Sequence, residues 1–283
     1  MHSKVWSRRE LLSAAAVLGV ALPSAPAGAK ASRGVGPIRF ADRRAEMLAM
    51  IRVQADVAGR IAPWWYTGYI YGMRPGEQPR KLVRFEGSEI NLFTPQADGT
   101  FVQTGRTTSF FSDIDSEQVL ESWVNPYTGA TVAVRANLLG GAGRAVWSEA
   151  GIDPQFGPAI AAGGAAPTSS PQPLHITWTR YGSRIWVRHD RAYPPGMPAP
   201  IGESSTSLIE RRDLDNHRLT SIPALFASTY MAPWPTWMGM QGQPGHVIWH
   251  ADGLKLDRIE DLPAPYLDRL RRLHPQQLVP LPG

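Results

Sequence analysis

His189 is the residue whose type and surroundings best suit acid–base chemistry. The polarity of residues 184–190 alternates along the chain, which predicts a strand. On such a strand His189 shares an apolar face with Ile185 and Val187. An imidazole in that position is either a hydrogen-bonded core group or a general base in a ligand pocket, because it titrates close to neutral pH. Both interpretations stay open, and His189 is a candidate catalytic residue.

Glu86 and Tyr69 are the other candidates for acid–base chemistry, and they fall on two predicted strands, 82–86 and 65–71. Glu86 lies two residues after Arg84, so the two side chains share one face of their strand. Such a pair is either structural or a carboxylate that a guanidinium orients at the mouth of a cavity. The predicted catalytic set is therefore His189, Glu86 and Tyr69.

The abundance of aromatic residues indicates a cavity for a flat or apolar molecule. The chain contains 10 Trp, 8 Tyr and 8 Met. Most such side chains fill protein cores, but this number of Trp exceeds what one core of this size usually needs. Those left over could line a cavity, with methionines as adaptable walls. The candidate ligand-binding residues are Trp65, Tyr71, Arg84, Trp178, Trp237 and Met238.

His246 and His250 have the spacing of a metal-binding pair on a helix, but the residues between them predict a strand. Strand residues four apart are separated by about 13 Å, which is too far for one zinc ion with bonds of about 2 Å. We therefore predict no metal site. The chain has no cysteine, which excludes disulfides, thiolate metal sites and a cysteine nucleophile. The sequence does not identify a cofactor.

Charge and missing motifs disfavour several other classes of function. The net charge is +5 and no dense run of Lys and Arg occurs, so we expect no nucleic acid partner. The Gly-x-Ser-x-Gly string of α/β-hydrolases is absent. The glycines of residues 140–143 lack the spacing of a dinucleotide-binding loop. The partner that we predict is a small apolar or aromatic molecule.

Residues 1–29 have the features of a twin-arginine export signal. Arg8 and Arg9 precede an apolar run over residues 11–22, and residues 27–29 form a small-x-small cleavage site. The apolar run is shorter than the roughly 20 residues that cross a bilayer, and no second segment is long enough. We expect the twin-arginine export machinery to carry the chain to the periplasm or out of the cell, with no membrane span in the mature part.

The elements that must position the candidate residues are mostly strands. From residue 64 onward, short segments with a period of two alternate with turn signals, and no helix of crossover length lies between them. This pattern predicts serial antiparallel hairpins. About ten such strands must hide their edges. We therefore predict a single, mainly β domain over residues 61–283, an antiparallel, calycin-like β-barrel that is large enough to hold a small ligand.

Helices and a loop complete the predicted organisation. Residues 30–60 form an N-terminal helical segment, in which a helix over 41–57 starts at the capping residue Asp42. A second helix over 265–273 closes the domain. Residues 138–173 are expected to form a flexible loop, because they are rich in Gly, Ala, Pro and Ser. A strand break is predicted at Gly87 and a hairpin turn at residues 251–253.

Three stretches of the sequence resemble a known family. They are residues 82–87 with the following Asn91, residues 121–129, and residues 235–263. The string Trp-Val-Asn-Pro-Tyr-Thr-Gly at residues 123–129 is the most distinctive of them. On these residues the chain resembles the bacterial domain-of-unknown-function family 1838. The resemblance implies an exported, soluble domain, and it supplies no catalytic residues because the family has no established activity.

Three functions remain open from the sequence. The first is a barrel that binds a small apolar or aromatic molecule. The second is a cofactor-independent isomerase, lyase or hydratase that acts on such a molecule in the same cavity, with a titratable group pointing into it. The third is a structural or partner-binding protein, which requires a filled interior and an exposed apolar patch.

Overall fold

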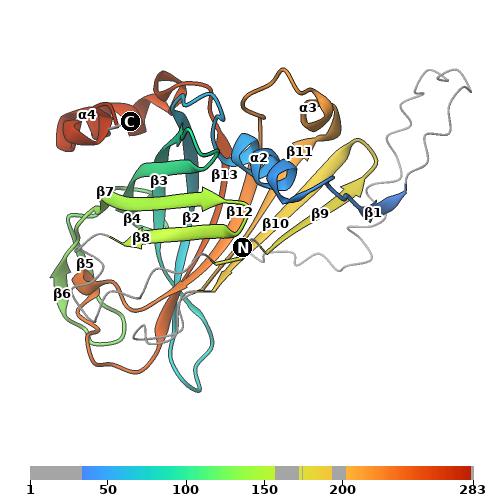
Figure 1. The fold of residues 1–283 in the computed structure, drawn as a ribbon. Helices are drawn as coiled ribbons and strands as arrows, with labels where there is room; N and C mark the ends of the chain where they lie inside the picture. Colours follow the sequence, from blue (N-terminus) through green and yellow to red (C-terminus); the bar gives the residue numbers. More distant parts are fainter. Residues whose placement is uncertain (1–33, 157–171, 174, 193–201, 282–283) are drawn as a thin grey trace, which may run out of the picture. The chain divides into compact units, whose positions relative to one another are not determined.

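The structure is a computed structural model that describes residues 34–156, 172–173, 175–192 and 202–281 (Figure 1). The predicted export signal lies outside the described residues. The helices are α2 (Arg43–Gln54), α3 (Arg211–Asp215) and α4 (Ala264–Leu273), and the short 3-10 helices are η3 (Thr236–Met238), η4 (Ile259–Asp261) and η5 (Pro275–Leu278). No helix in this part of the chain is both long and apolar enough to cross a membrane.

Most of the chain forms one antiparallel sheet of 11 strands, in the order β1-β9-β10-β11-β12-β13-β2-β3-β4-β7-β8, and β5 and β6 form a separate hairpin. The strands are β1 (Val35–Pro37), β2 (Ala62–Met73), β3 (Arg80–Pro95), β4 (Phe101–Ser112), β5 (Ser122–Val124), β6 (Thr131–Ala133), β7 (Asn137–Ser148), β8 (Gly151–Phe156), β9 (Ile176–Tyr181), β10 (Arg184–Ala192), β11 (Gly202–Glu210), β12 (Leu225–Ala232) and β13 (His246–Lys255).

The prediction of a mainly antiparallel β fold is confirmed, whereas the closed, calycin-like barrel is not. Within the described residues the outermost strands, β1 and β8, do not pair with each other, so the sheet stays open. Both edge strands are short, and each contains a proline, Pro37 or Pro154, that has no N–H to offer a further strand. Short strands and prolines protect an edge without closure.

The sheet curls around helix α2, as Figure 1 shows. Asp42 caps this helix as predicted, accepting a hydrogen bond from the Ala45 N–H at 2.7 Å. The helix contacts β7, and its Glu46 accepts a hydrogen bond from the Trp178 indole of β9 at 3.2 Å. In a flat sheet these two strands would be about 38 Å apart, although a helix of this length spans only about 18 Å. The strands must therefore bend towards α2 and enclose it on a concave inner face.

Two apolar clusters occupy the inner face. The first surrounds α2 and contains Met47, Met50, Ile51 and the buried Trp147 of β7. The second lies further along β2–β4 and β13, where the β5–β6 hairpin and the segment around η3 cover the sheet. The fully buried Asn125, in the turn between β5 and β6, holds this cover together by donating from Nδ2 to the Met238 carbonyl oxygen at 2.7 Å.

Helix α4 covers part of the convex outer face. Its Tyr266, Leu267 and Leu270 pack with Phe110 of β4 and with Trp65 of β2. The Tyr266 hydroxyl donates to the carbonyl oxygen of Thr108 and lies 2.9 Å from the Ser88 hydroxyl. Strands β2–β4 are therefore apolar on both faces.

The structure differs from the sequence expectations in three places. Strands β7 and β8 occupy much of the predicted loop 138–173, because pairing with the long strand β4 satisfies the backbone of a glycine-rich segment. Residues 157–171 of that loop lie outside the described residues. Strand β3 continues through Gly87, and β13 continues through the predicted turn at residues 251–253. The glycines in these strands make room for aromatic rings instead of ending the strands.

Candidate functional site

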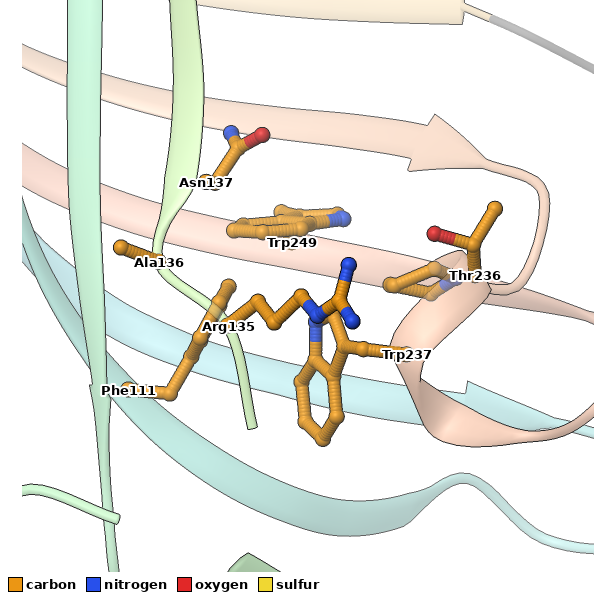
Figure 2. A pocket seen from close by; sticks show the side chains of 8 residues that line it. Phe111, Arg135, Ala136, Asn137, Thr236, Trp237 and Trp249 are labelled. Atoms are coloured by element: carbon orange, nitrogen blue, oxygen red, sulfur yellow. The ribbon is translucent and has the colours of Figure 1, made fainter. Parts of the chain in front are cut away.

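A cavity of about 250 Å³ opens at the end of the inner face that lies away from α2. Figure 2 shows it between the sheet, the segment that leads into β7 and the loop that carries η3. It is lined by Phe111, Arg135, Ala136, Asn137, Pro235, Thr236, Trp237 and Trp249.

Aromatic rings from separate elements form the apolar walls of the cavity. Phe111 of β4 and Trp249 of β13 project from the inner face of the sheet, with ring centroids 5.7 Å apart. Trp237 of η3 closes the opposite side, 5.1 Å from Phe111, and Trp123 of the β5–β6 hairpin supports it from behind at 5.6 Å. The β5–β6 hairpin and the η3 loop therefore hold Trp237 in place as the third wall. No strand of the sheet could supply this wall, because it lies opposite the sheet.

The polar side chains of the lining are those of Arg135, Asn137 and Thr236. Arg135 is exposed, and in the described part of the chain no carboxylate pairs with its guanidinium. The indole N–H of Trp249 is buried and has no acceptor. Among the described residues the lining contains no Asp or Glu, so these residues give the cavity one positive charge and no negative one.

Tyr66 and Ser109 form a hydrogen-bonded pair of hydroxyls, 3.0 Å apart, beside the floor of the cavity. Ser109 lies two residues before Phe111 on the same face of β4, and it pairs across the strands with Asn137. Burial raises the pKa of the Tyr66 hydroxyl far above its ordinary value. Both hydroxyls are therefore uncharged at physiological pH, and the pair acts by donating and accepting hydrogen bonds.

Two glycines hold Tyr66 in this position. In the register of the sheet Tyr66 lies between Gly253 of β13 and Gly87 of β3. A Cβ atom at Gly87 would lie 2.4 Å from the Tyr66 ring, and one at Gly253 would lie 2.4 Å from the Phe226 ring. Glycine in a strand often marks such a close approach. The absence of side chains lets the Tyr66 ring lie over β3, and its hydroxyl reaches Ser109 on β4.

A series of side-chain hydrogen bonds runs along the inner face from the α2 end to a carboxylate near Tyr66. The Trp147 indole donates to Gln103 at 2.8 Å, and the Gln103 amide donates to Asn91 at 3.2 Å. The Asn91 amide in turn donates to Glu89 Oε1 at 2.9 Å. Glu89 lies two residues from Gly87 on the same face of β3, so its carboxylate is oriented by the series on the Tyr66 side of the sheet.

The structure places the predicted residues in several different environments. Trp237 lines the cavity, and Met238 lies fully buried beneath it in the second apolar cluster. His189 is buried on the inner face of β10, four strands away from β2 in the sheet order. Trp178 belongs to the core around α2. His246 and His250 lie four residues apart on strand β13, as expected.

The remaining predicted residues lie on the outer face, opposite to His189. Glu86 accepts a hydrogen bond from the Trp65 indole at 3.0 Å and pairs with Arg269 of α4 at 3.5 Å. Arg84 pairs with Glu117. The ammonium nitrogen of Lys81 lies 3.8 Å from the ring centroid of Tyr69 and 5.9 Å from that of Tyr71. The structure therefore does not bring Glu86 or Tyr69 together with His189.

Most of the residues that form the cavity and its polar border are not among the site residues that the sequence predicts. Phe111, Trp249, Arg135, Asn137, Tyr66 and Glu89 were all outside the predicted set. Glycines inside strong strand patterns were the available signal for Tyr66, because they indicate that a ring from a neighbouring strand crosses them. No comparable signal precedes Arg135, which reaches the cavity only because the η3 loop folds back over the sheet.

A family model described as protein of unknown function (DUF1838) matches residues 60–137 and 202–278, more than half of the chain. The two matched segments contain every residue of the cavity lining, together with Tyr66, Glu89 and Ser109. His189 and Trp178 fall in the unmatched stretch between them. No curated protein and no solved structure matches the chain significantly.

Proposed function

We propose that this chain, which belongs to the DUF1838 family, binds a small flat aromatic molecule in the cavity between β4, β13 and the η3 loop. The observation that carries the proposal is a half-open cavity of about 250 Å³ whose aromatic walls are Phe111, Trp237 and Trp249. As the export signal leads us to expect, we place this activity in the periplasm or outside the cell.

The size and walls of the cavity favour a molecule of one or two rings. A dry protein cavity of about 150 Å³ is already large enough for benzene. Aromatic walls attract flat rings through stacked or edge-to-face contacts, each worth about 0.5–1.5 kcal/mol beyond the area that they bury. A ring that packs against Trp237, Trp249 or Phe111 gains such contacts, whereas an alkyl chain gains only burial.

A titration with indole as the probe tests the proposal, and calorimetry measures the binding. We expect saturable binding to the native chain, and about tenfold weaker binding to Trp237→Ala, since that variant removes one wall. Trp186→Ala is the matched control, because Trp186 is 53% exposed on β10 and lies outside the cavity lining. Melting curves of both variants show whether they remain folded. Binding of indole that is equal in both variants would place the site elsewhere.

A second candidate function is catalysis on the bound molecule without a cofactor, as an isomerase, lyase or hydratase. The observation that favours it is the oriented carboxylate of Glu89, which acts electrostatically on Tyr66, together with the Tyr66–Ser109 pair, whose Ser109 is the cross-strand neighbour of the lining residue Asn137. A carboxylate can serve as general base, and a neutral phenol can donate a hydrogen bond to an oxygen on which negative charge develops. His189, whose catalytic role stays a prediction, lies on the same face of the sheet.

Native mass spectrometry of protein isolated from its own host identifies any retained molecule, which then serves as the substrate of the catalytic test. We expect the native chain to convert that molecule and Glu89→Gln to bind it without conversion. His189→Ala, assayed in parallel, decides whether the histidine takes part. A retained molecule that the native chain leaves unchanged would remove the catalytic function and leave the binding function standing.

A further inference from the structure

We infer that the cavity selects anionic aromatic molecules, those that carry a carboxylate on a flat ring system. This inference rests on the proposed binding function and adds the charge of the ligand to it. Its basis is the polar part of the lining, which supplies a cation and hydrogen-bond donors but no carboxylate.

Arg135 is the residue that sets the charge of the site. Its guanidinium has no carboxylate partner within the described residues, in contrast to Arg84 and Arg269, which pair with Glu117 and Glu86 on the outer face. An arginine is charged at any physiological pH, and its planar fork matches the two oxygens of a carboxylate. A negative group of the ligand is therefore the partner that this guanidinium lacks.

The position of Arg135 places its cation beside the aromatic walls against which a ring would pack. Figure 2 shows its side chain reaching across the cavity, with the guanidinium between the indoles of Trp249 and Trp237. A ligand that places its ring against these walls and Phe111 brings a carboxylate on a short arm to the guanidinium. The Asn137 amide and the Thr236 hydroxyl, which also line the cavity, are further donors for that group.

The same lining acts against cationic aromatic molecules. An ammonium group on the ring would face the like charge of Arg135 and would find no Asp or Glu in the lining. A neutral molecule would keep the ring contacts but leave the guanidinium to water. The expected order of affinity is anion first, neutral molecule second and cation last.

Three indole derivatives of similar size test this order by calorimetry: indole-3-acetate, indole-3-acetamide and tryptamine. For the native chain we expect indole-3-acetate to bind roughly three- to tenfold more tightly than indole-3-acetamide, the range of one partly exposed charge-assisted pair. Tryptamine should bind most weakly. In Arg135→Gln the difference between acetate and acetamide should disappear. Arg218→Gln, which changes an exposed arginine outside the lining, should leave the native order unchanged.

The outcomes separate this inference from the function on which it rests. Equal binding of acetate and acetamide to the native chain, or tighter binding of tryptamine, overturns the charge selection and leaves the aromatic site in place. A preference for acetate that survives in Arg135→Gln also overturns the inference, because another group then recognises the charge. Failure of all three compounds to bind refutes the proposed function itself.

Discussion

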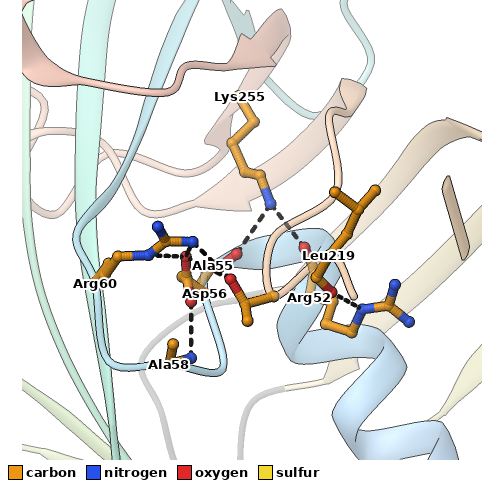
Figure 3. Close-up of polar contacts among 8 residues, drawn as sticks. Arg52, Ala55, Asp56, Ala58, Arg60, Leu219 and Lys255 are labelled. Atoms are coloured by element: carbon orange, nitrogen blue, oxygen red, sulfur yellow. Dashed lines mark hydrogen bonds and ion pairs between the residues drawn. The ribbon is translucent and has the colours of Figure 1, made fainter. Parts of the chain in front are cut away.

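Replacing Lys255 by Met tests the anchoring of α2 inside the curled sheet. The ammonium of Lys255, at the end of β13, donates to the main-chain carbonyl oxygens of Arg52, Val53 and Ala55 at 2.7, 2.9 and 3.0 Å. Figure 3 shows the bonds to Arg52 and Ala55. These carbonyls belong to the last turn of α2, which has no further helical N–H groups to pair with them. Met keeps the length and the apolar stem of the side chain but removes all three donors.

The expected cost follows from the partners that would be lost. The Arg52 carbonyl also accepts the Ile222 N–H at 2.8 Å, so it keeps one partner in the variant. The carbonyls of Val53 and Ala55 lose their side-chain donor, and a buried polar group without a partner costs about 1–3 kcal/mol. At pH 9 the folded Lys255 is a neutral amine that still has two N–H groups to donate, so we expect Lys255→Met to lower the free energy of unfolding by about 2–6 kcal/mol.

The pH dependence of this loss has a definite sign. Burial lowers the pKa of Lys255 from 10.5 to about 7. Between these two values the unfolded chain holds a proton that the folded chain lacks, so the contribution of Lys255 to stability rises with pH, by at most about 1.4 kcal/mol per pH unit. The difference between the native chain and Lys255→Met should therefore be larger at pH 9 than at pH 7, and constant below pH 7.

Urea unfolding of both chains at pH 6, 7, 8 and 9 measures this difference directly. Lys81→Met is the matched control, because Lys81 is exposed on β3 and contacts tyrosine rings instead of carbonyls. We expect it to change the free energy of unfolding by less than about 1 kcal/mol at every pH. A difference for Lys255→Met that increases toward pH 6 would refute the reasoning, because the three carbonyls would then favour the ammonium more than burial disfavours it.

Three further predictions concern the fold and the export signal. Gly87→Ala should displace the Tyr66 ring and lower the melting temperature by several degrees, whereas Gly36→Ala, where a Cβ meets no atom within 4 Å, should not. Tyr266→Phe should cost about 1–3 kcal/mol in urea unfolding, since it removes the buried hydroxyl that contacts Ser88 and Thr108. Burial raises the pKa of Tyr266, so the native chain should also lose stability above about pH 10, and less so in this variant. Changing both Arg8 and Arg9 to Lys should retain the full-length precursor inside the cell, as immunoblots of cell fractions would show.

Local patterns in the sequence predicted the elements better than their arrangement. The alternation of residues 184–190 corresponds to β10, which pairs with β9. Asp42 caps α2 because a carboxylate one turn before an apolar helix meets its free N–H groups, which is a purely local effect. Closure of the sheet depends instead on whether β1 and β8 meet, and nothing within either strand encodes that contact.

The choice of the inner face was the step that the sequence could not decide. On β2 the set Trp65, Tyr69 and Tyr71 alternates with the set Trp64, Tyr66 and Ile70, and both sets are apolar. Period two shows which residues share a face but not which face is inside. Here α4 covers Trp65 on the outer face, while α2 covers Trp64 on the inner one. The catalytic candidate Tyr69 and the ligand-binding candidates Trp65 and Tyr71 therefore lie on the outer face of the curled sheet.

The cavity and its polar border depend on contacts between segments that are far apart in the sequence. Tyr66 reaches Ser109 only because Gly87 leaves the space above β3 empty, and Trp237 faces Phe111 only because Asn125 fixes the η3 loop to the β5–β6 turn. Each of these positions looks neutral or unfavourable in its local pattern, since glycine weakens a strand and a buried asparagine needs partners. Residues that break a local rule and are then compensated by distant contacts are expected at functional sites. For this reason we place the proposed function at the cavity. The outer face of β2, where Trp65, Tyr69 and Tyr71 alternate more regularly, is not chosen.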